Sequence, residues 1–466
     1  MSEYPSPALR PAPAPRSPLS RGSALTGPSP GRGRQAPGAP AFRRRKLLAA
    51  AALAALAACS GGGDGEPAGA EDWRSETITA GNVTTVRTIS GSIWGGTARL
   101  EEELSIGVEA GDDPYMLGSV RALATDGDEI FVLDQQVPAI RVYDAAGRHL
   151  RDIGKDGEGP GEFRRPESMV LGADGRIFVR DPRTGRITIF SRQGAAVGTI
   201  PVRSGFSTGT PMVITHDGTL YNYQLLNQGA DVRDWQLALV PRFENESEEG
   251  EPIRPPELDF EEMRIEARRE GSTSINSVPF APSSSWTLAP SGAVIAGVST
   301  DYTFEIHYPD GRVTRVEKAW LPVPVEPAEA AWQKRRATAN MRNTDPEWVW
   351  NGPEVPTTKP AFSRFLADHA GRIWVNRPGA GYHTEGECIE NPSIDEVSEA
   401  YSEPCWREHS TWDVFDEEGR YLGDADLPEG IQMYPAPHID DTVFLSAFQD
   451  DLGIVLVKRY RIVLPE

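Results

Sequence analysis

The sequence has little cysteine, few basic residues relative to acidic ones, and no apolar run long enough to cross a membrane as a helix. Three cysteines occur in 466 residues, and the formal net charge is −21. A strongly negative chain repels nucleic acid and anionic lipid surfaces. We therefore expect no nucleic-acid partner, and we expect any membrane contact to be made by an attached lipid.

Residues 1–42 contain few large apolar side chains and consist mainly of Pro, Ser, Ala, Gly and Arg. Such a segment cannot bury enough surface to offset the entropy of ordering it. We expect a disordered extension, or a stretch that precedes the true start of translation.

Residues 43–58 have the composition of an export signal. The basic residues Arg43 to Lys46 precede the apolar run Leu47–Ala58, which is too short to be a stable membrane-spanning helix. The end of this run with Cys59 and Ser60 resembles the bacterial lipobox, in which the cysteine is acylated and becomes the new N-terminus. The resemblance implies lipidation of Cys59, and two or three acyl chains anchor a protein stably. The alternative is an ordinary cleavage site with an incidental cysteine.

The glycine-rich residues after Cys59 predict a flexible tether over residues 59–80. Ser60 resembles the residue found in lipoproteins sorted to the outer membrane. We expect an exported lipoprotein on the periplasmic side of the outer membrane or at the cell surface. Since residues 1–58 hold nine Lys and Arg and one acid, the remainder carries a net charge of −29.

Two stretches, residues 120–153 and 167–200, align without a gap at an offset of 47 residues. A repeat of this length, built from short β runs, predicts a propeller blade or another closed array. The matched positions are Ile130 with Ile177, Val132 with Val179, Asp134 with Asp181, Ile140 with Ile187, Tyr143 with Phe190, Gly147 with Gly194, and Ile153 with Ile200.

Four more degenerate copies of this repeat follow. The sequence therefore predicts six blades, each of up to four short antiparallel strands. We therefore predict an all-β fold, a six-bladed β-propeller over residues 81–466. The last blade lacks a convincing fourth strand, and we expect either Thr85–Ile89 or Arg99–Ile106, which have nowhere else to pair, to supply it and close the ring. The further copies are Met212–Val240, Trp286–Val316, Phe362–Leu427 and Ile439–Ile462.

The segment from Ile153 to Phe163, followed by the strand after Asp174-Gly175, resembles the NHL repeat. It is more closely similar to bacterial six-bladed propeller lipoproteins with NHL-like blades. The resemblance implies a six-bladed ring and, for that family at large, binding roles with a minority of enzymes.

Three long insertions, residues 241–278, 319–359 and 377–410, all belong to loops on one face of a propeller. Insertions in repeat folds gather on the working face, so we interpret them as a lid over the mouth of the central channel. Tolerated drift without function is the alternative. Helices are predicted at Pro327–Arg336, where acids precede bases, and at Glu257–Arg269.

Cys388 and Cys405 both lie in the third insertion, which we expect to have no strands of its own. In an oxidising envelope, two such cysteines favour a disulfide. The alternative is a zinc site, because His383 and His409 flank the pair with the spacing of structural zinc ligands.

Two arginines, Arg121 and Arg364, fall on one level of the inner strands when the blades are aligned by their turns. Together with Arg165 and Lys359 at the rim, they predict an anion pocket. The alternative is that these cations pair with acids of neighbouring blades.

These features favour a non-enzymatic, monomeric binding or scaffold protein without a cofactor, whose lidded face binds a protein, peptide or glycan. The alternative is an enzyme similar to the gluconolactonase-like lactonases and esterases, which hold a divalent metal in the channel with carboxylate and amide side chains. The inner level here shows arginine, serine and proline, which counts against the enzyme.

Overall fold

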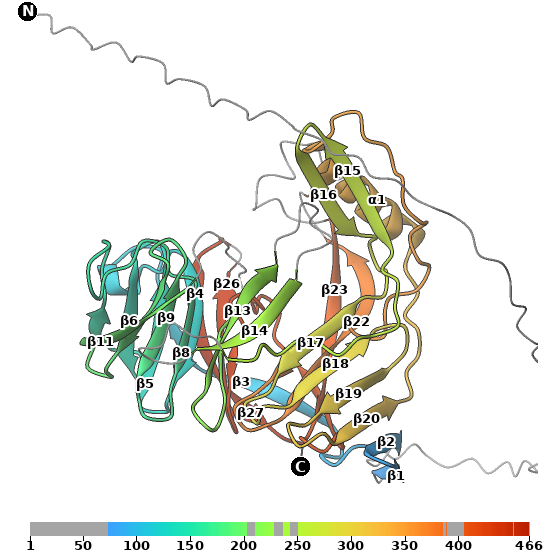
Figure 1. The fold of residues 1–466 in the computed structure, drawn as a ribbon, viewed down its shortest axis with the longest axis horizontal. Helices are drawn as coiled ribbons and strands as arrows, with labels where there is room; N and C mark the ends of the chain where they lie inside the picture. The colour runs from blue at the N-terminus through green and yellow to red at the C-terminus, as the bar shows by residue number, and fades with distance from the viewer. Residues whose placement is uncertain are drawn as a thin grey trace, which may run out of the picture. The chain divides into compact units, whose positions relative to one another are not determined.

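The computed structural model describes residues 73–202, 210–227, 236–242, 250–384, 388, 405–450 and 452–465. The extension predicted for residues 1–42, the export signal predicted for residues 43–58 and Cys59 lie outside these residues. Most of the described chain is β-strand, drawn as arrows in Figure 1; each of the first two blades is a four-stranded sheet, and blades five and six share one eight-stranded sheet. No helix in the part of the chain that the structure describes has the length and apolarity needed to cross a membrane.

The first two blades follow the repeat seen in the sequence. Their matched positions are buried, and the paired glycines Gly147 and Gly194 adopt positive φ in tight turns. The strands are β4 (Val120–Thr125), β5 (Glu129–Asp134), β6 (Ala139–Asp144) and β7 (His149–Ile153), then β8 (Ser168–Leu171), β9 (Ile177–Asp181), β10 (Arg186–Phe190) and β11 (Ala196–Pro201).

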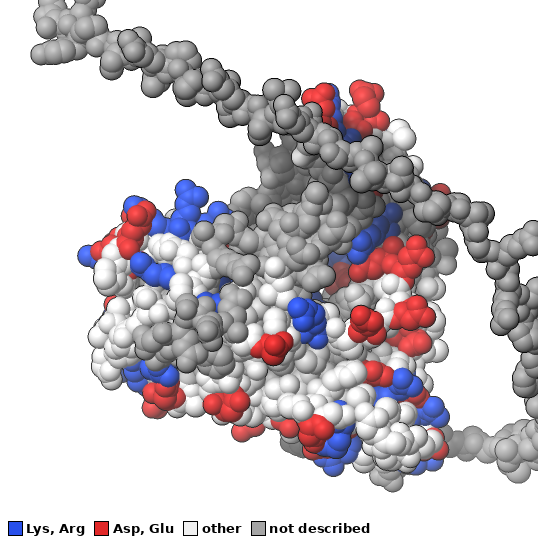
Figure 2. Space-filling view, viewed as in Figure 1, with Lys and Arg blue, Asp and Glu red and all other residues white. Residues whose placement is uncertain are grey.

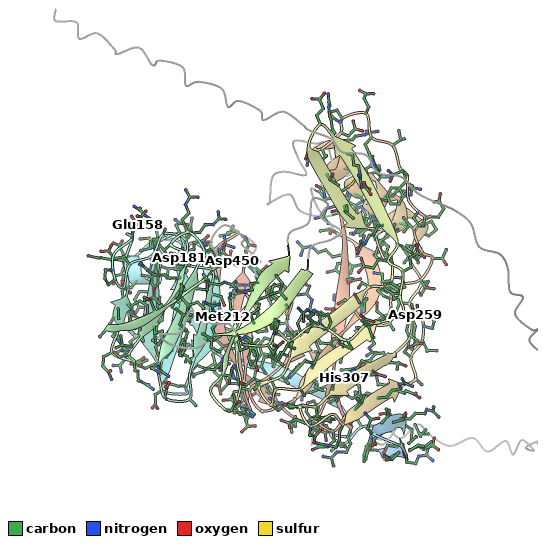
Figure 3. All side chains as sticks on the ribbon, viewed as in Figure 1. Glu158, Asp181, Met212, Asp259, His307 and Asp450 are labelled. Atoms are coloured by element: carbon green, nitrogen blue, oxygen red, sulfur yellow. A yellow bond between two sulfur atoms is a disulfide. The ribbon has the colours of Figure 1, made fainter. Side chains whose placement is uncertain are left out.

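The matched acids Asp134 and Asp181 have the same structural role in their blades. Asp181, labelled in Figure 3, accepts hydrogen bonds from the backbone N–H groups of Arg164 and Arg165, before its blade, and of Arg183. Asp134 accepts the equivalent bonds from Gly118, Ser119 and Gln136. A fully buried carboxylate at the end of the second strand therefore fixes the loop that enters the blade.

In the described chain, blades four and five contain four consecutive strands each, whereas blades three and six contain three consecutive strands each. Blade three has three strands and a bridge from Leu239 to Ile253 in place of a fourth. Blades three and four contain β12 (Val213–Ile214), β13 (Leu220–Asn227), β14 (Gln236–Arg242), β17 (Ser284–Leu288), β18 (Val294–Val298), β19 (Thr303–His307) and β20 (Val313–Lys318). Blades five and six contain β21 (Arg364–Ala367), β22 (Ile373–His383), β23 (Trp406–Phe415), β24 (Tyr421–Asp426), β25 (His438–Ile439), β26 (Val443–Gln449) and β27 (Val455–Val463).

The core consists of apolar clusters between neighbouring sheets. Such clusters join blades one and two, two and three, four and five, five and six, and six and one. Blades three and four are linked by the hydrogen bond from His216 N to Pro290 O (2.7 Å) and by the Tyr223–Trp286 ring contact (centroids 6.3 Å apart). Each blade therefore packs on the next, and the sixth packs on the first.

The ring is closed by an N-terminal strand, as predicted from the sequence. β3 (Thr97–Ile106) pairs antiparallel with β27 of blade six and, over residues 97–99, parallel with β24 of blade five, so it lies between these two strands. Opposite charges line this seam, because Lys458 pairs with Glu102 (2.9 Å) and Arg459 with Glu103 (3.4 Å). Exposed ion pairs add little stability singly, but opposed rows of charge favour one register over its alternatives.

The other N-terminal candidate, Thr85–Ile89, has a partner that we did not predict. It lies in β2 (Val83–Ser90), which pairs parallel with β20 at the outer edge of blade four. β1 (Arg74–Ala80) extends that sheet, so the tether predicted for residues 59–80 is wrong over its last seven residues. The β-branched run Thr77-Ile78-Thr79 and the positive φ of Gly81 form a hairpin there instead.

A buried polar network joins blades four and five. Asp413, which is fully buried, accepts hydrogen bonds from the hydroxyls of Tyr302 (2.6 Å) and Tyr421 (3.1 Å) and from Lys318 Nζ (2.9 Å). Burial, with Asp413 next in effect, raises the pKa of both tyrosines, so they remain protonated donors. The network places a charged crosslink beside the largest apolar cluster.

Charged side chains of both signs are interspersed over the face drawn in Figure 2. Many of them pair locally, as Arg315 does with Glu305 (2.7 Å) and Arg312 with Asp310 (2.7 Å). Local pairing of this kind does not account for the acidic excess of the chain.

Candidate functional site

The lid insertions fold together on one face of the ring, as the sequence predicted. α1 (Pro327–Arg342) begins at the expected proline and continues six residues beyond the predicted end. It packs on the hairpin of β15 (Arg264–Arg269) and β16 (Ser272–Ser277), beyond the ends of β22 and β23 (Figure 1). Their shared cluster has six buried residues: Ile265, Ala267, Val278, Ala281, Met341 and Trp348.

The helix predicted for Glu257–Arg269 is wrong. Residues 264–269 form β15, which pairs with Ser272–Ser277 across a turn containing Gly271 at φ +80°. Buried Ile265 and Ala267 alternate with more exposed neighbours, so the segment buries one face as a strand. A hairpin partner and a tight turn overrode a composition that favours helix.

The third insertion continues the blade-five hairpin and does not form a loop without strands. β22 runs to His383 and β23 starts at Trp406, with a bulge between Pro378 and Gly381. The prediction of an insertion without strands of its own is therefore corrected. The extra pairs carry side chains from the blade up to the lid, because strand pairing propagates as long as both backbones stay extended.

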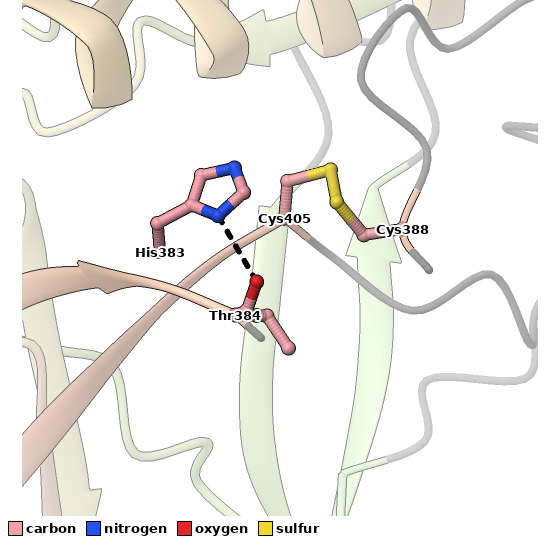
Figure 4. Close-up of a disulfide and its surroundings, with 4 residues drawn as sticks. All are labelled: His383, Thr384, Cys388 and Cys405. Atoms are coloured by element: carbon pink, nitrogen blue, oxygen red, sulfur yellow. Dashed lines mark hydrogen bonds between the residues drawn. A yellow bond between two sulfur atoms is a disulfide. The ribbon is translucent and has the colours of Figure 1, made fainter. Parts of the chain in front are cut away.

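The predicted disulfide is present between Cys388 and Cys405 (S–S 2.09 Å) (Figure 4). His383 lies beside it, with ligand atoms of the three residues within 4.8 Å of one another, and its Nδ1 is 3.0 Å from Thr384 O. His409, the fourth residue of the zinc alternative, stacks on Tyr382 instead (centroids 4.6 Å apart). In this state both sulfurs are bonded to each other, so the four residues form no tetrahedral thiolate site.

A groove of about 890 Å³ separates the lid from blades five and six. The α1 helix, the β22–β23 hairpin, residues 280–283 and the connection after β24 form its walls. Aromatic and acidic side chains dominate the lining, which includes Phe280, Glu329, Gln333, Tyr382, Trp406, Arg407, Glu408, His409, Asp426 and Glu429.

Lys359 lies beneath this groove and is not available to an anion. Its buried ammonium contacts Glu329 Oε1 at 2.9 Å and Glu408 Oε2 at 2.6 Å, and it lies 5.2 Å from the Phe280 ring centroid. The predicted role of Lys359 in an anion pocket is therefore corrected. The triad links α1, which carries Glu329, to β23, which carries Glu408. Loss of any one member would leave a buried charge uncompensated.

The open side of the groove has polar groups next to aromatic rings. The Tyr382 hydroxyl donates to Glu429 Oε1 at 3.3 Å, and Arg407 Nη1 lies 3.6 Å from the same oxygen. Burial, reinforced by Glu429, raises the pKa of Tyr382, so its hydroxyl remains a donor at neutral pH. Trp406 contacts the His383 ring edge to face and also lines the groove.

The central channel is a separate cavity of about 180 Å³, lined by residues from all six inner strands and their flanks. Arg121 lies there, its guanidinium 5.7 Å from the Tyr434 ring centroid and its Nε donating to Gln135 Oε1 (3.1 Å). Glu167 and His438 also line it, and each has a buried polar atom without a hydrogen-bond partner. Burial, with His369 next in effect, lowers the pKa of His438 to about 3.

The four predicted anion-binding residues do not meet in one cavity. Arg121 lines the channel, whereas Arg165 and Arg364 are exposed and line neither the channel nor the groove. A role for these three arginines in binding stays a prediction. The sequence did not single out Glu329, Glu408 or Asp426. The sequence contained only weak signals for them: Glu329 is an acid in the first turn of a predicted helix, and Glu408 lies close to an aromatic residue.

The closed ring of six sheets defines a six-bladed β-propeller with its insertions on one face. A family model described as 6-bladed beta-propeller matches residues 111–173. No curated protein matches the chain.

Solved structures similar to this one include a Bacteroides fragilis protein at 12% identity, which covers 78% of this chain and 95% of its own with a TM-score of 0.41. A Bacteroides vulgatus protein has 9% identity, coverage of 79% and 99%, and a TM-score of 0.40. Virginiamycin B lyase from Staphylococcus aureus has 8% identity, coverage of 77% and 99%, and a TM-score of 0.36.

Proposed function

We propose that this protein is a lipid-anchored binding or scaffold protein of the bacterial cell envelope. In this proposal Cys59 is acylated after export, and the groove under the lid binds a protein, peptide or glycan without catalysis. The lipobox-like sequence supports the anchor, and the disulfide suits an oxidising compartment.

The groove is the observation that carries the binding role. It is large enough for several residues or sugar units, and part of its wall comes from insertions that the ring does not need for closure. Binding sites gather on such loops when a rigid scaffold positions them. Phe280, Tyr382 and Trp406 provide faces on which sugar rings or peptide side chains can pack.

Two experiments test the proposal. Incorporation of labelled palmitate should be lost in a Cys59→Ser variant, and labelling that persists contradicts the anchor. For the groove, the exported region is screened against peptide and oligosaccharide panels. A Tyr382→Ala, Trp406→Ala double variant should lose the retained ligands.

A matched control is Trp350→Ala, a lid aromatic that does not line the groove. If the double variant binds as well as the control, the ligand site lies elsewhere. Turnover of a lactone or ester that depends on added divalent metal would favour the enzymatic alternative instead.

A further inference from the structure

The groove carries more negative than positive charge. Four carboxylates line it, those of Glu329, Glu408, Asp426 and Glu429. They are opposed by Arg407 in the lining and by Lys359 beneath it. Among the described residues that line or underlie the groove, acids exceed Lys and Arg by two, which favours a cationic ligand.

Acceptor oxygens in the groove also lack partners. Glu329 is 2% exposed, and its Oε2 has no hydrogen-bond partner although Oε1 binds Lys359. Within the described part of the chain, Asp426 is exposed and its side chain has no hydrogen bond or ion pair. Glu408 uses only Oε2 for Lys359. Glu329 Oε2 is enclosed against Gly381, so the acceptors that a cationic donor in the groove can reach are the Asp426 carboxylate and Glu408 Oε1.

Gly381 keeps this arrangement open. A Cβ atom at this position would lie 2.4 Å from the Glu329 carboxyl group. Any other residue would displace Glu329, so the β22 bulge next to Pro378 and the missing side chain together let the carboxylate approach the hairpin.

We infer that the ligand of the groove is a basic peptide segment, with an Arg or Lys side chain bound at Glu408 and Asp426. This inference rests on the proposed function and narrows it. A guanidinium presents several N–H donors that match carboxylates, and cations also favour aromatic faces such as Tyr382 and Trp406. A neutral glycan would leave the two excess charges uncompensated.

The test measures Kd for three labelled probes: a hexapeptide with two arginines and a tyrosine, its glutamate counterpart, and chitohexaose. The basic peptide should bind best, more weakly as salt is raised. A Glu408→Gln, Asp426→Asn variant should weaken it about tenfold. The matched control is Glu354→Gln, an exposed lid acid paired with Lys334 outside the groove.

Because Glu408 also binds Lys359, the thermal unfolding midpoints of the variants are compared with that of the wild type. If the double variant is unstable, binding is measured for Asp426→Asn alone. Equal binding of the acidic peptide, or a basic peptide insensitive to Asp426→Asn, overturns the inference. Binding of chitohexaose alone overturns it while leaving the proposed function standing. If no probe binds at the groove, the inference fails, and the peptide and oligosaccharide panels decide the proposed function.

Discussion

The ring and the lid bury their apolar surface in different ways. The cluster between blades four and five has fourteen buried members and joins two sheets, whereas the lid cluster has six buried members from a hairpin, a helix and the segments beside them. A small cluster at the edge of a fold opens at lower free energy than a core shared by large sheets. The comparison teaches that the lid can be changed, by mutation or by evolution, without loss of the ring.

The largest expected effect comes from an aromatic residue of the ring. Trp374 is fully buried between blades five and six and donates from Nε1 to Asp368 Oδ2 at 2.8 Å. Trp374→Ala should lower the free energy of unfolding by about 4 kcal/mol, because it leaves a cavity and removes one of the two side-chain donors to Asp368 Oδ2. Urea denaturation followed by circular dichroism measures this. A loss below about 1 kcal/mol would contradict the described packing.

A comparable effect is expected at the crosslink between blades four and five. Asp413→Ala removes the acceptor of two tyrosine hydroxyls and leaves Lys318 without its carboxylate, so unfolding should become easier by about 3 kcal/mol. The control is Asp310→Ala, an exposed acid paired with Arg312, which should change stability by about 0.5 kcal/mol or less. Equal effects of the two variants would rule out a special role for Asp413.

An intermediate effect is expected from pH. The pKa of His438 is about 3 in the folded chain and that of an unfolded histidine is about 6.5, so between these values the unfolded state binds the additional proton. Stability from this group is complete above pH 6.5 and falls as the pH is lowered, by about 2 kcal/mol at pH 5. His438→Leu should flatten this slope in urea titrations at pH 5 and 7.

The smallest global effect is expected in the lid. Trp348 is 4% exposed and its Nε1 donates to Glu266 O at 2.7 Å, yet it contacts the lid cluster and not the ring. Trp348→Ala should leave the urea midpoint of the ring within experimental error while increasing proteolysis of residues 250–355. A global loss comparable to that of Trp374→Ala would show that ring and lid form one cooperative unit.

The ring could be predicted from the sequence because its information is local and repeated. The register of residues 120–153 on 167–200 placed β8 and β10 to the residue, since alternation and tight turns recur in each blade. Closure by an N-terminal strand, either Thr85–Ile89 or Arg99–Ile106, was also predicted, because an incomplete last blade leaves an exposed edge.

The lid and the N-terminal edge could be predicted only in part because their partners are distant in sequence. Lys359 contacts Glu329 and Glu408, which lie 30 and 49 residues away in the sequence, and no local sequence pattern predicts that triad. In the same way, β2 pairs with a strand 230 residues further on, and composition gave no sign of this pairing. Such contacts depend on which surfaces tertiary packing brings together.

The closure of blade six determines when the ring can be completed during biosynthesis. β3 leaves the ribosome early, whereas its partner β27 is among the last segments to be made. The ion pairs of the β3 glutamates with Lys458 and Arg459 can therefore form only when translation is almost complete. A nascent chain cannot complete its propeller blade by blade, and a copy truncated before residue 455 presents an open strand edge that another copy can occupy.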